Sequence, residues 1–140
     1  MKIYFSASIK GGRQLVGDYA KMIARMKLYG QVLTEHIGDD KFVSGATQTP
    51  QEVYLRDKRL MDECDVVIAD VTVPSLGVGY ELAYCESKNL PIFCLYGGQE
   101  NSLSFMVSGN ANFTVFHYDG VDEALETIDE IFQKRCRKNA

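Results

Sequence analysis

Short apolar runs alternate along this chain with longer segments whose apolar positions recur at helical spacing. The apolar runs predict strands over residues 2–7, 31–34, 65–69, 91–96 and 113–117. The fourth run, Pro-Ile-Phe-Cys-Leu-Tyr, is apolar without alternation, which is typical of a parallel strand that is buried on both faces. Helices are expected over residues 13–28, 49–63, 79–88 and 121–135.

The second of these helices carries a clear start signal. Thr49 offers a capping hydroxyl, Pro50 follows at the first helical position, and Glu52 comes three residues after the cap. The preceding segment, residues 38–49, is polar and contains glycine, so it is expected to be a loop. Residues 97–112 are also expected to be a loop, with one helical turn around residues 104–107.

Strands that alternate with helices predict an α/β fold with a doubly wound, five-stranded parallel sheet. The expected architecture is flavodoxin-like or Rossmann-like, with helices on both faces of the sheet. At 140 residues, and without an internal repeat or a linker, the chain is expected to form one domain over residues 1–140.

Composition and charge narrow the possible functions. Hydrophobic residues make up 46% and charged residues 24% of the chain, which is ordinary for a globular protein. The net charge of -4, without a long basic run, argues against nucleic-acid binding. No apolar run approaches the ~20 residues that span a bilayer, and the start of the chain lacks a signal-peptide pattern, so a cytoplasmic protein without membrane association is expected.

The four cysteines are scattered and do not pair with either histidine at metal-binding spacing. Free thiols in a reducing compartment are therefore expected, with no metal site and no cofactor. The four positions are Cys64, Cys85, Cys94 and Cys136.

The loop after the first strand has the composition of an oxyanion site. Ser8 offers a hydroxyl, and Gly11 and Gly12 allow backbone amides to approach a ligand ahead of a helix. Lys10 and Arg13 add positive charge. A plain glycine-rich turn with solvated basic residues explains the same pattern, and the spacing is not that of a P-loop.

The segment after the third strand contains a candidate nucleophile. Gly77 and Gly79 resemble part of a dinucleotide fingerprint, but Leu82 replaces the third glycine and the segment does not follow the first strand, which argues against NAD. Glu81 lies at the expected start of a helix, beside small residues that leave space for a ligand. It could equally be a first-turn glutamate that complements the helix dipole.

A second carboxylate, Asp57, lies on the preceding helix. It is either a residue of a solvated helix face or the partner of Glu81 in a glycosidase pair, in which one carboxylate attacks the anomeric carbon and the other handles the leaving-group proton. Tyr4 is either a core residue or a hydroxyl that orients a carboxylate. His36 is either a polar residue at the end of a strand or part of a binding site, and His117 is given no role.

Nearly the whole chain, from Tyr4 to the last helix, resembles the 2′-deoxynucleoside 5′-monophosphate N-glycosidases of the Rcl type, within the nucleoside 2-deoxyribosyltransferase superfamily. Three blocks carry the resemblance, and they occur in the order that the family has. They are Tyr-Phe-Ser-Ala-Ser-Ile-Lys-Gly-Gly-Arg at residues 4–13, Val-Leu-Thr-Glu-His at residues 32–36, and Asp-Val-Val-Ile-Ala-Asp-Val-Thr-Val-Pro-Ser-Leu-Gly-Val-Gly-Tyr-Glu-Leu at residues 65–82.

The resemblance implies roles for residues in these blocks. Glu81 corresponds to a nucleophile that attacks the sugar C1′ and forms a covalent deoxyribosyl-5-phosphate enzyme, Asp57 to an aspartate that assists proton transfer, and Tyr4 to a tyrosine that positions the nucleophile. His36 corresponds to a histidine near the base, and Ser104 to a serine that reaches the phosphate from the neighbouring subunit of a homodimer. The remaining substrate-binding candidates, which include the 5′-phosphate cradle, are Ser8, Ile9, Lys10, Gly11, Gly12, Arg13, Ser75, Gly77 and Gly79.

The chain also departs from the family pattern. Lys10 replaces an arginine, so a phosphate would meet a point charge rather than a planar fork. Ala7 replaces a glycine, and the loop over residues 38–49 differs in sequence and length, which leaves the base preference open.

The expected function is therefore hydrolysis of a nucleoside 5′-monophosphate, in its deoxy form, to free base and sugar phosphate. Four alternatives stay open from the sequence: a deoxyribosyltransferase acting on unphosphorylated nucleosides, a ribonucleotide N-glycosidase acting on CMP-type substrates, a non-catalytic nucleotide-binding module and a flavodoxin-like electron carrier.

Overall fold

The sheet has five parallel strands, as the sequence predicts. The computed structural model describes residues 1–9 and 14–138 of the chain. Its strands are β1 (Lys2–Ser6), β2 (Gln31–Val32), β3 (Val66–Asp70), β4 (Ile92–Tyr96) and β5 (Phe113–His117). All neighbouring strands run parallel, in the order β2-β1-β3-β4-β5. This is the flavodoxin-like order of a doubly wound sheet, so the predicted fold class is confirmed.

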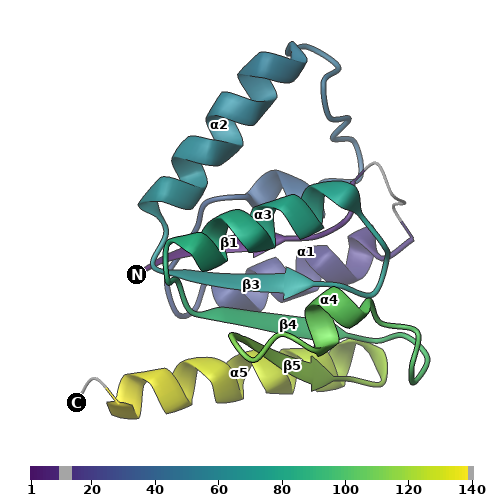
Figure 1. Ribbon diagram of the computed structural model, residues 1–140, viewed down its shortest axis with the longest axis vertical. Coiled ribbons are helices and arrows are strands. Elements are labelled where there is room, and N and C mark those ends of the chain that lie inside the picture. The colour runs from purple at the N-terminus through teal and green to yellow at the C-terminus, as the bar shows by residue number, and fades with distance from the viewer. Residues whose placement is uncertain (10–13, 139–140) are drawn as a thin grey trace.

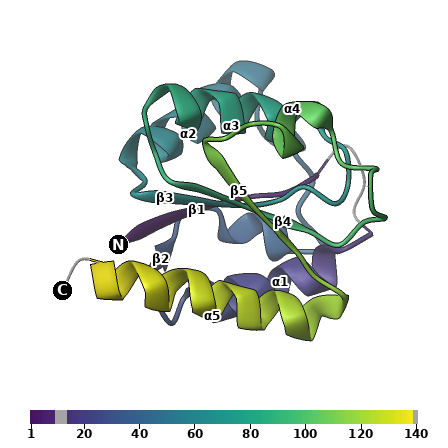
Figure 2. The same cartoon turned by 60° about the horizontal axis from the view of Figure 1, so that its bottom comes forward.

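Helices cover both faces of the sheet and give a three-layer arrangement (Figure 1, Figure 2). Figure 2 shows α1 (Val16–Met26) and α5 (Gly120–Lys138) on one face, with α2 (Pro50–Glu63), α3 (Leu76–Ser87) and the short α4 (Phe105–Ser108) on the other. A 3-10 helix, η1 (Glu35–Gly38), follows β2.

Alternation along β1 divides the core between the two faces. Ile3 and Phe5 pack with the apolar sides of α1 and α5. Tyr4 points to the opposite face, where it packs with residues of α2 and α3 such as Met61 and Leu82. Because successive side chains of a strand point to opposite faces, Ser6, the next even-numbered residue of β1, also faces α2 and α3.

The start of α2 forms the capping box that the sequence predicts. The Thr49 hydroxyl accepts a hydrogen bond from the Glu52 amide at 3.2 Å, and the Glu52 carboxylate accepts one from the Thr49 amide at 2.8 Å. Two backbone donors that the helix itself leaves unpaired are thereby satisfied. Because the cap fixes where α2 begins, it also fixes which residues of α2 face the sheet edge.

Two predicted boundaries are wrong in ways that matter for the site. The second strand ends at Val32 rather than at residue 34, because the Thr34 hydroxyl donates to the Phe5 carbonyl at 2.7 Å and accepts from the Phe5 amide at 3.0 Å, bonds that its own backbone would otherwise make. His36 therefore lies in η1 and does not end a strand. The third long helix begins at Leu76 rather than at residue 79, because Ser75 caps it.

The first helix begins at Val16, three residues later than expected, and the last one extends to Lys138. Within the part of the chain that the structure describes, no helix has the length and apolar character needed to cross a membrane.

Candidate active site

A large cavity with convergent polar groups lies beside the carboxyl ends of β1 and β3. It has a volume of about 740 Å³ and lies between the loop after β1, the N-terminal half of α3 and one side of α2. In the order β2-β1-β3-β4-β5, β1 and β3 are the strands between which the winding direction reverses, and that is where ligands bind in such sheets. The described residues that line it are Ala7, Ile9, Ser44, Gly45, Gln48, Pro50, Val53, Tyr54, Asp57, Pro74, Ser75, Leu76, Gly77, Val78 and Glu81.

Glu81 lies in the second turn of α3, and its carboxylate borders this cavity. Because α3 begins at Leu76 and has no acidic residue in its first turn, the interpretation of Glu81 as a first-turn residue that complements the helix dipole is wrong. The Ser6 hydroxyl donates a hydrogen bond to Glu81 Oε2, and the Tyr4 hydroxyl donates a second one to the carboxylate. Burial raises the pKa of Glu81 to about 7 against these two hydrogen bonds, and the charge of Asp57 adds to the rise.

Tyr4 stays protonated beside this carboxylate. Its ring is buried, and burial together with the negative charges of Glu81 and Asp57 raises the pKa of its hydroxyl far above the usual range. A hydroxyl that does not ionise remains a donor, so Tyr4 can keep donating to the Glu81 carboxylate.

Ser6 is a contact of Glu81 that the sequence reasoning missed. Tyr4, Ser6 and Ser8 occupy alternate positions along and just beyond β1, so they share the face of the sheet that α3 covers. This period of two was available from the sequence. It does not by itself single out Ser6, which also fits the pattern of a polar residue at the end of an otherwise apolar strand.

Ser8 is fully buried, and its hydroxyl has no hydrogen-bond partner among the residues that the structure describes. A buried hydroxyl without a partner costs free energy unless a ligand or water satisfies it. Ile9, beside it, lines the cavity. The candidates Lys10, Gly11, Gly12 and Arg13 lie outside the described residues.

The N-terminus of α3 faces the same cavity. Ser75 is the cap residue, with its hydroxyl accepting from the Val78 amide at 3.3 Å, and Gly77 lies in the first turn. A Cβ added to Gly77 would meet only the Ser75 hydroxyl, at 3.7 Å, and one added to Gly79 would meet nothing within 4 Å. The packing of this chain therefore does not require either glycine. Gly77 borders the Glu81 cavity, whereas Gly79 borders a neighbouring one.

Asp57 lines the cavity from the α2 side, so the structure brings both candidate carboxylates to one space. Arg56 Nε pairs with Asp57 Oδ1 at 2.8 Å, and both side chains are about four-fifths buried, with 21% exposed in each. The charge of Asp57 contributes to the raised pKa values of Glu81 and Tyr4, which places the three groups within electrostatic reach of one another. Asp57 is thus not part of a solvated helix face.

His36 does not appear among the described residues that line the cavity, although it is connected to it. Its ring centroid lies 4.6 Å from that of Phe42, and the Arg56 guanidinium lies 6.0 Å from the centroid of the Phe42 ring. A chain of contacts therefore links His36 to Asp57: His36 contacts Phe42, Phe42 lies near Arg56, and Arg56 pairs with Asp57.

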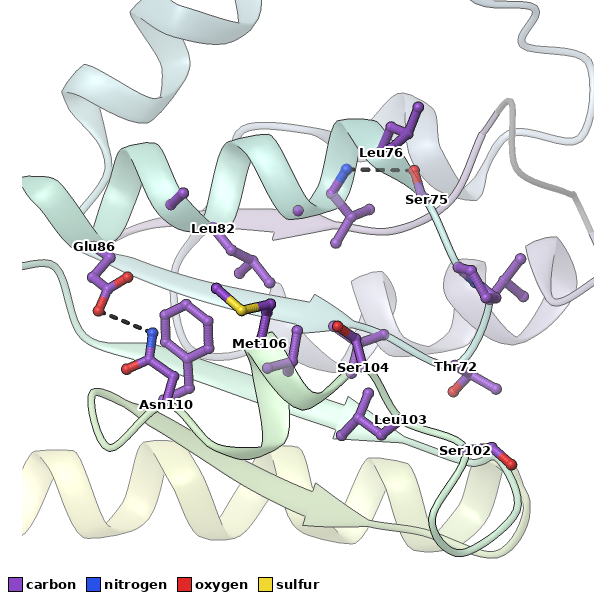
Figure 3. A pocket seen from close by; sticks show the side chains of 18 residues that line it. Thr72, Ser75, Leu76, Leu82, Glu86, Ser102, Leu103, Ser104, Met106 and Asn110 are labelled. Carbon is purple, nitrogen blue, oxygen red and sulfur yellow. Dashed lines mark hydrogen bonds between the residues drawn. The ribbon is translucent and has the colours of Figure 1, made fainter.

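Ser104 borders a second cavity of about 500 Å³, which Figure 3 shows between α3 and α4. Ser75 lines both cavities, whereas Ser104 lines only this one among the described residues. Within one chain, Ser104 is therefore separated from the Glu81 cavity by the segment that contains Ser75.

Asp70 and three cysteines are buried titratable groups that lie outside the Glu81 cavity. Asp70, at the end of β3, is fully buried, and burial raises its pKa while it accepts hydrogen bonds from Tyr118 at 2.8 Å and from the Thr72 amide at 3.1 Å. Three cysteines, at positions 64, 85 and 94, are free and buried, as the sequence predicts for them. The described residues contain no group of three or more metal-ligating side chains.

Together, the fold and the cavity define a doubly wound α/β protein with a pair of carboxylates at the switch point of its sheet. The chain belongs to the nucleoside 2-deoxyribosyltransferase family, whose model matches residues 3–125. It is 38% identical over 131 residues to the 5-hydroxymethyl-dUMP N-hydrolase of Mus musculus, and this match covers 90% of this chain and 76% of the mouse protein. It is 37% identical over 145 residues to the enzyme of the same name from Esox lucius, and this match covers 99% of this chain and 100% of the Esox protein.

A solved structure shares the fold at much lower sequence identity. The CMP N-glycosidase BcmB of Clostridium botulinum superposes with a TM-score of 0.63 at 17% identity, covering 92% of this chain and 99% of that one. This likeness concerns the fold. The family model and both sequence relatives span most of this chain, and the family assignment that the sequence motifs indicate is confirmed.

Proposed function

We propose that this protein hydrolyses the N-glycosidic bond of 2′-deoxynucleoside 5′-monophosphates to a free base and 2-deoxyribose 5-phosphate. The observation that carries the proposal is that two carboxylates, Glu81 and Asp57, line one cavity. The names of the relatives from mouse and pike support it, because 5-hydroxymethyl-dUMP is a 2′-deoxynucleoside 5′-monophosphate.

Glu81 acts as the nucleophile in this proposal. Its carboxylate attacks C1′, the glycosidic C–N bond breaks, and the base leaves with the bonding electrons while a proton reaches it from the Asp57 side. Water, deprotonated on the same side, then hydrolyses the glycosyl ester and releases the sugar phosphate. A pKa of about 7 leaves Glu81 substantially ionised at neutral pH and still a better nucleophile than an ordinary carboxylate.

Tyr4 and Ser6 hold the attacking carboxylate. Both donate to it, so its rotation is restricted and its charge is stabilised. A deoxyribose ring suits this chemistry, because it lacks the 2′-hydroxyl that would withdraw electrons from the oxocarbenium-like transition state.

The 5′-phosphate is assigned to the end of the cavity that Ile9 and the first turn of α3 form, next in sequence to the buried Ser8. The partnerless Ser8 hydroxyl and the amides at the start of this 12-residue helix offer donors to an oxyanion. Lys10, Gly11, Gly12 and Arg13 are proposed to complete the phosphate cradle. Binding energy from the phosphate would then orient C1′ over Glu81.

We further propose a homodimer in which Ser104 completes the phosphate site of the neighbouring subunit. Support comes from the surface around the second cavity, where Leu76 is 97% exposed, Phe105 84% and Met106 83%. Large apolar side chains exposed together are typical of an interaction surface. Ser104 directly precedes this group in α4, so a second copy docked here would bring a Ser104 close to the start of α3.

The remaining assignments follow from the sequence. A single domain over residues 1–140, a cytoplasmic location and the absence of nucleic-acid binding are proposed for this enzyme. Its net charge of -4 gives no broad basic surface for a nucleic acid.

The proposal is tested by incubating the protein with dGMP, dAMP, dUMP, dCMP and CMP and measuring released base. Base release from deoxynucleotides, lost in Glu81→Gln, is expected. Release only from unphosphorylated nucleosides, with a new nucleoside formed when an acceptor base is added, would instead indicate a transferase. Preferential cleavage of CMP would indicate the ribonucleotide enzyme, and nucleotide binding without any release would indicate a non-catalytic module.

A further inference from the structure

Arg56 joins three parts of the cavity wall through one guanidinium group. Its Nε donates to Asp57 Oδ1 at 2.8 Å, its Nη1 donates to Gln48 Oε1 at 3.0 Å, and its plane lies over the Phe42 ring. Arg56 is only 21% exposed, and its five N–H groups have a fixed planar arrangement. The positions of Gln48 and Asp57 are therefore fixed relative to each other.

This contact decides how the Gln48 amide is oriented. A guanidinium group has donors and no acceptor, so only the oxygen of the amide can face it. The NH₂ group, with its two donors, must then point away from Arg56. No described residue accepts a hydrogen bond from it, and Gln48 lines the cavity that contains Glu81.

Gln48 lies on the base side of this cavity if the proposed function holds. The phosphate end is formed by Ile9 and the start of α3, and the sugar lies at Glu81, so the base extends towards α2 and the segment before it. Asp57 is next to the glycosidic nitrogen in this arrangement. Gln48 is separated from Asp57 by one guanidinium group and its two hydrogen bonds, a span comparable with the length of a nucleobase.

We propose that the Gln48 NH₂ group donates a hydrogen bond to a carbonyl oxygen on the edge of the base remote from the sugar. The enzyme thereby prefers 6-oxopurine and 4-oxopyrimidine nucleotides to their 6-amino and 4-amino counterparts. This inference rests on the proposed function for the direction in which the nucleotide lies. It adds a residue that selects the base to the residues that act on the sugar.

The chemistry of the two edges makes the selection directional. An oxo group accepts from Gln48, whereas an amino group at the same position sets donor against donor and leaves both unpaired. One lost hydrogen bond in a partly buried site corresponds to about a three- to tenfold change in affinity. Because the amino nucleotide also leaves two donors unpaired, its affinity is expected to be lower than that of the oxo nucleotide by about tenfold or more.

The test compares dGMP with dAMP and dUMP with dCMP, so that ring size is constant within each pair. For each nucleotide, kcat/KM is measured from base release. The dissociation constant is measured by calorimetry on the Glu81→Gln variant. Gln48→Ala is expected to reduce the oxo-over-amino ratio to about one. Gln48→Glu keeps an acceptor for Arg56 but replaces the donor with an acceptor, so the ratio is expected to fall below one.

Gln51→Ala is the matched control, because Gln51 is an exposed glutamine in the first turn of α2 that does not line the cavity. It should leave both ratios unchanged. An unchanged ratio in Gln48→Ala, or a wild-type protein without oxo preference, would overturn the inference. If no base is released from any nucleotide, the proposed function fails, and the dissociation constants still decide the role of Gln48. Absence of nucleotide binding would overturn both.

Discussion

The Ser6 hydroxyl donates a hydrogen bond to the Glu81 carboxylate and so connects β1 to α3 at the switch point of the sheet. The carboxylate lies in a place that favours its neutral form, since burial raises its pKa to about 7. Ser6 and Tyr4 oppose this effect by stabilising the ionised form. Burial and the two hydrogen bonds thus act in opposite directions on the pKa of Glu81, and the predictions below depend on this balance.

Activity should follow the ionisation of Glu81. Because only the carboxylate can attack C1′, kcat/KM for base release is expected to rise with pH and to level off above a pH of about 7. Glu81→Gln should lower kcat by at least about a thousandfold, while the dissociation constant for a deoxynucleotide changes little. Initial rates from pH 5 to 9 measure this, and a flat profile in the wild type would contradict the assignment.

The same substitution should stabilise the folded protein at high pH. The folded pKa of Glu81 lies above its ordinary value of 4.5, so this group favours folding most at pH below 4.5 and loses that contribution as pH rises through about 7. Glu81→Gln removes the titration and is expected to raise the free energy of unfolding by about 1–3 kcal/mol at pH 8.

Below pH 4.5 the difference between the two proteins should largely vanish. Urea unfolding at pH 4.5 and pH 8, for wild type and variant, gives the comparison. Asp57→Asn serves as a second variant, since removing its charge should lower the pKa of Glu81. A variant that is less stable than wild type at pH 8 would show that ionised Glu81 does not destabilise the fold.

Removing either hydroxyl that holds Glu81 should shift the pH profile upward. Ser6→Ala and Tyr4→Phe each remove a hydrogen bond that lowers the pKa of Glu81, so the rise in kcat/KM should move to higher pH in both. At pH 7 a loss of about tenfold is expected, with partial recovery at pH 9. Tyr29→Phe is the control, because Tyr29 bonds Asp129 at 2.7 Å on the opposite face of the sheet.

Much of the fold could be predicted from local patterns. The strands of a buried parallel sheet are apolar runs, and the start of α2 has all three residues of its cap, Thr49, Pro50 and Glu52. The start of α3 was predicted three residues late, because Gly77 and Gly79 are weak helix formers. The Ser75 cap outweighs this propensity. Because a serine in this loop also fits ligand binding, the sequence alone does not identify Ser75 as a helix cap.

The candidate site could be predicted only in part. Glu81, Asp57 and Tyr4 were found through motifs, and the structure brings them to one cavity or its wall. The contact between Arg56 and Gln48, on which the proposed role of Gln48 rests, joins a helix to a loop and is encoded by no periodic pattern of the sequence. Ser6 required attention to the period of two along β1 rather than to any motif.

Gly77→Ala should separate stability from substrate binding. An added Cβ meets only the Ser75 hydroxyl at 3.7 Å, and alanine favours a helix over glycine by about 1 kcal/mol, so the variant should be at least as stable as the wild type. Because Gly77 borders the Glu81 cavity, the same methyl group should raise KM for a deoxynucleotide severalfold. Gly17→Ala, where a Cβ meets nothing within 4 Å, should stabilise α1 without changing KM. An unaltered KM in Gly77→Ala would show that no ligand approaches this part of α3.

Subunit mixing should show whether Ser104 acts across a dimer. Ser104→Ala keeps Glu81 but should lose about tenfold in kcat/KM, since one hydrogen bond to the phosphate is removed. Glu81→Gln keeps Ser104 and should be inactive. In a heterodimer of the two variants, one site combines the intact Glu81 of the first chain with the intact Ser104 of the second, so a co-expressed mixture should be more active than the sum of the separate variants.

A Phe105→Asp substitution on the Ser104→Ala chain should abolish this rescue, because Phe105 belongs to the exposed apolar surface proposed to join the subunits. Activity of the mixture equal to that sum, with a single-chain mass in analytical ultracentrifugation, would contradict both the dimer and the role of Ser104 in it.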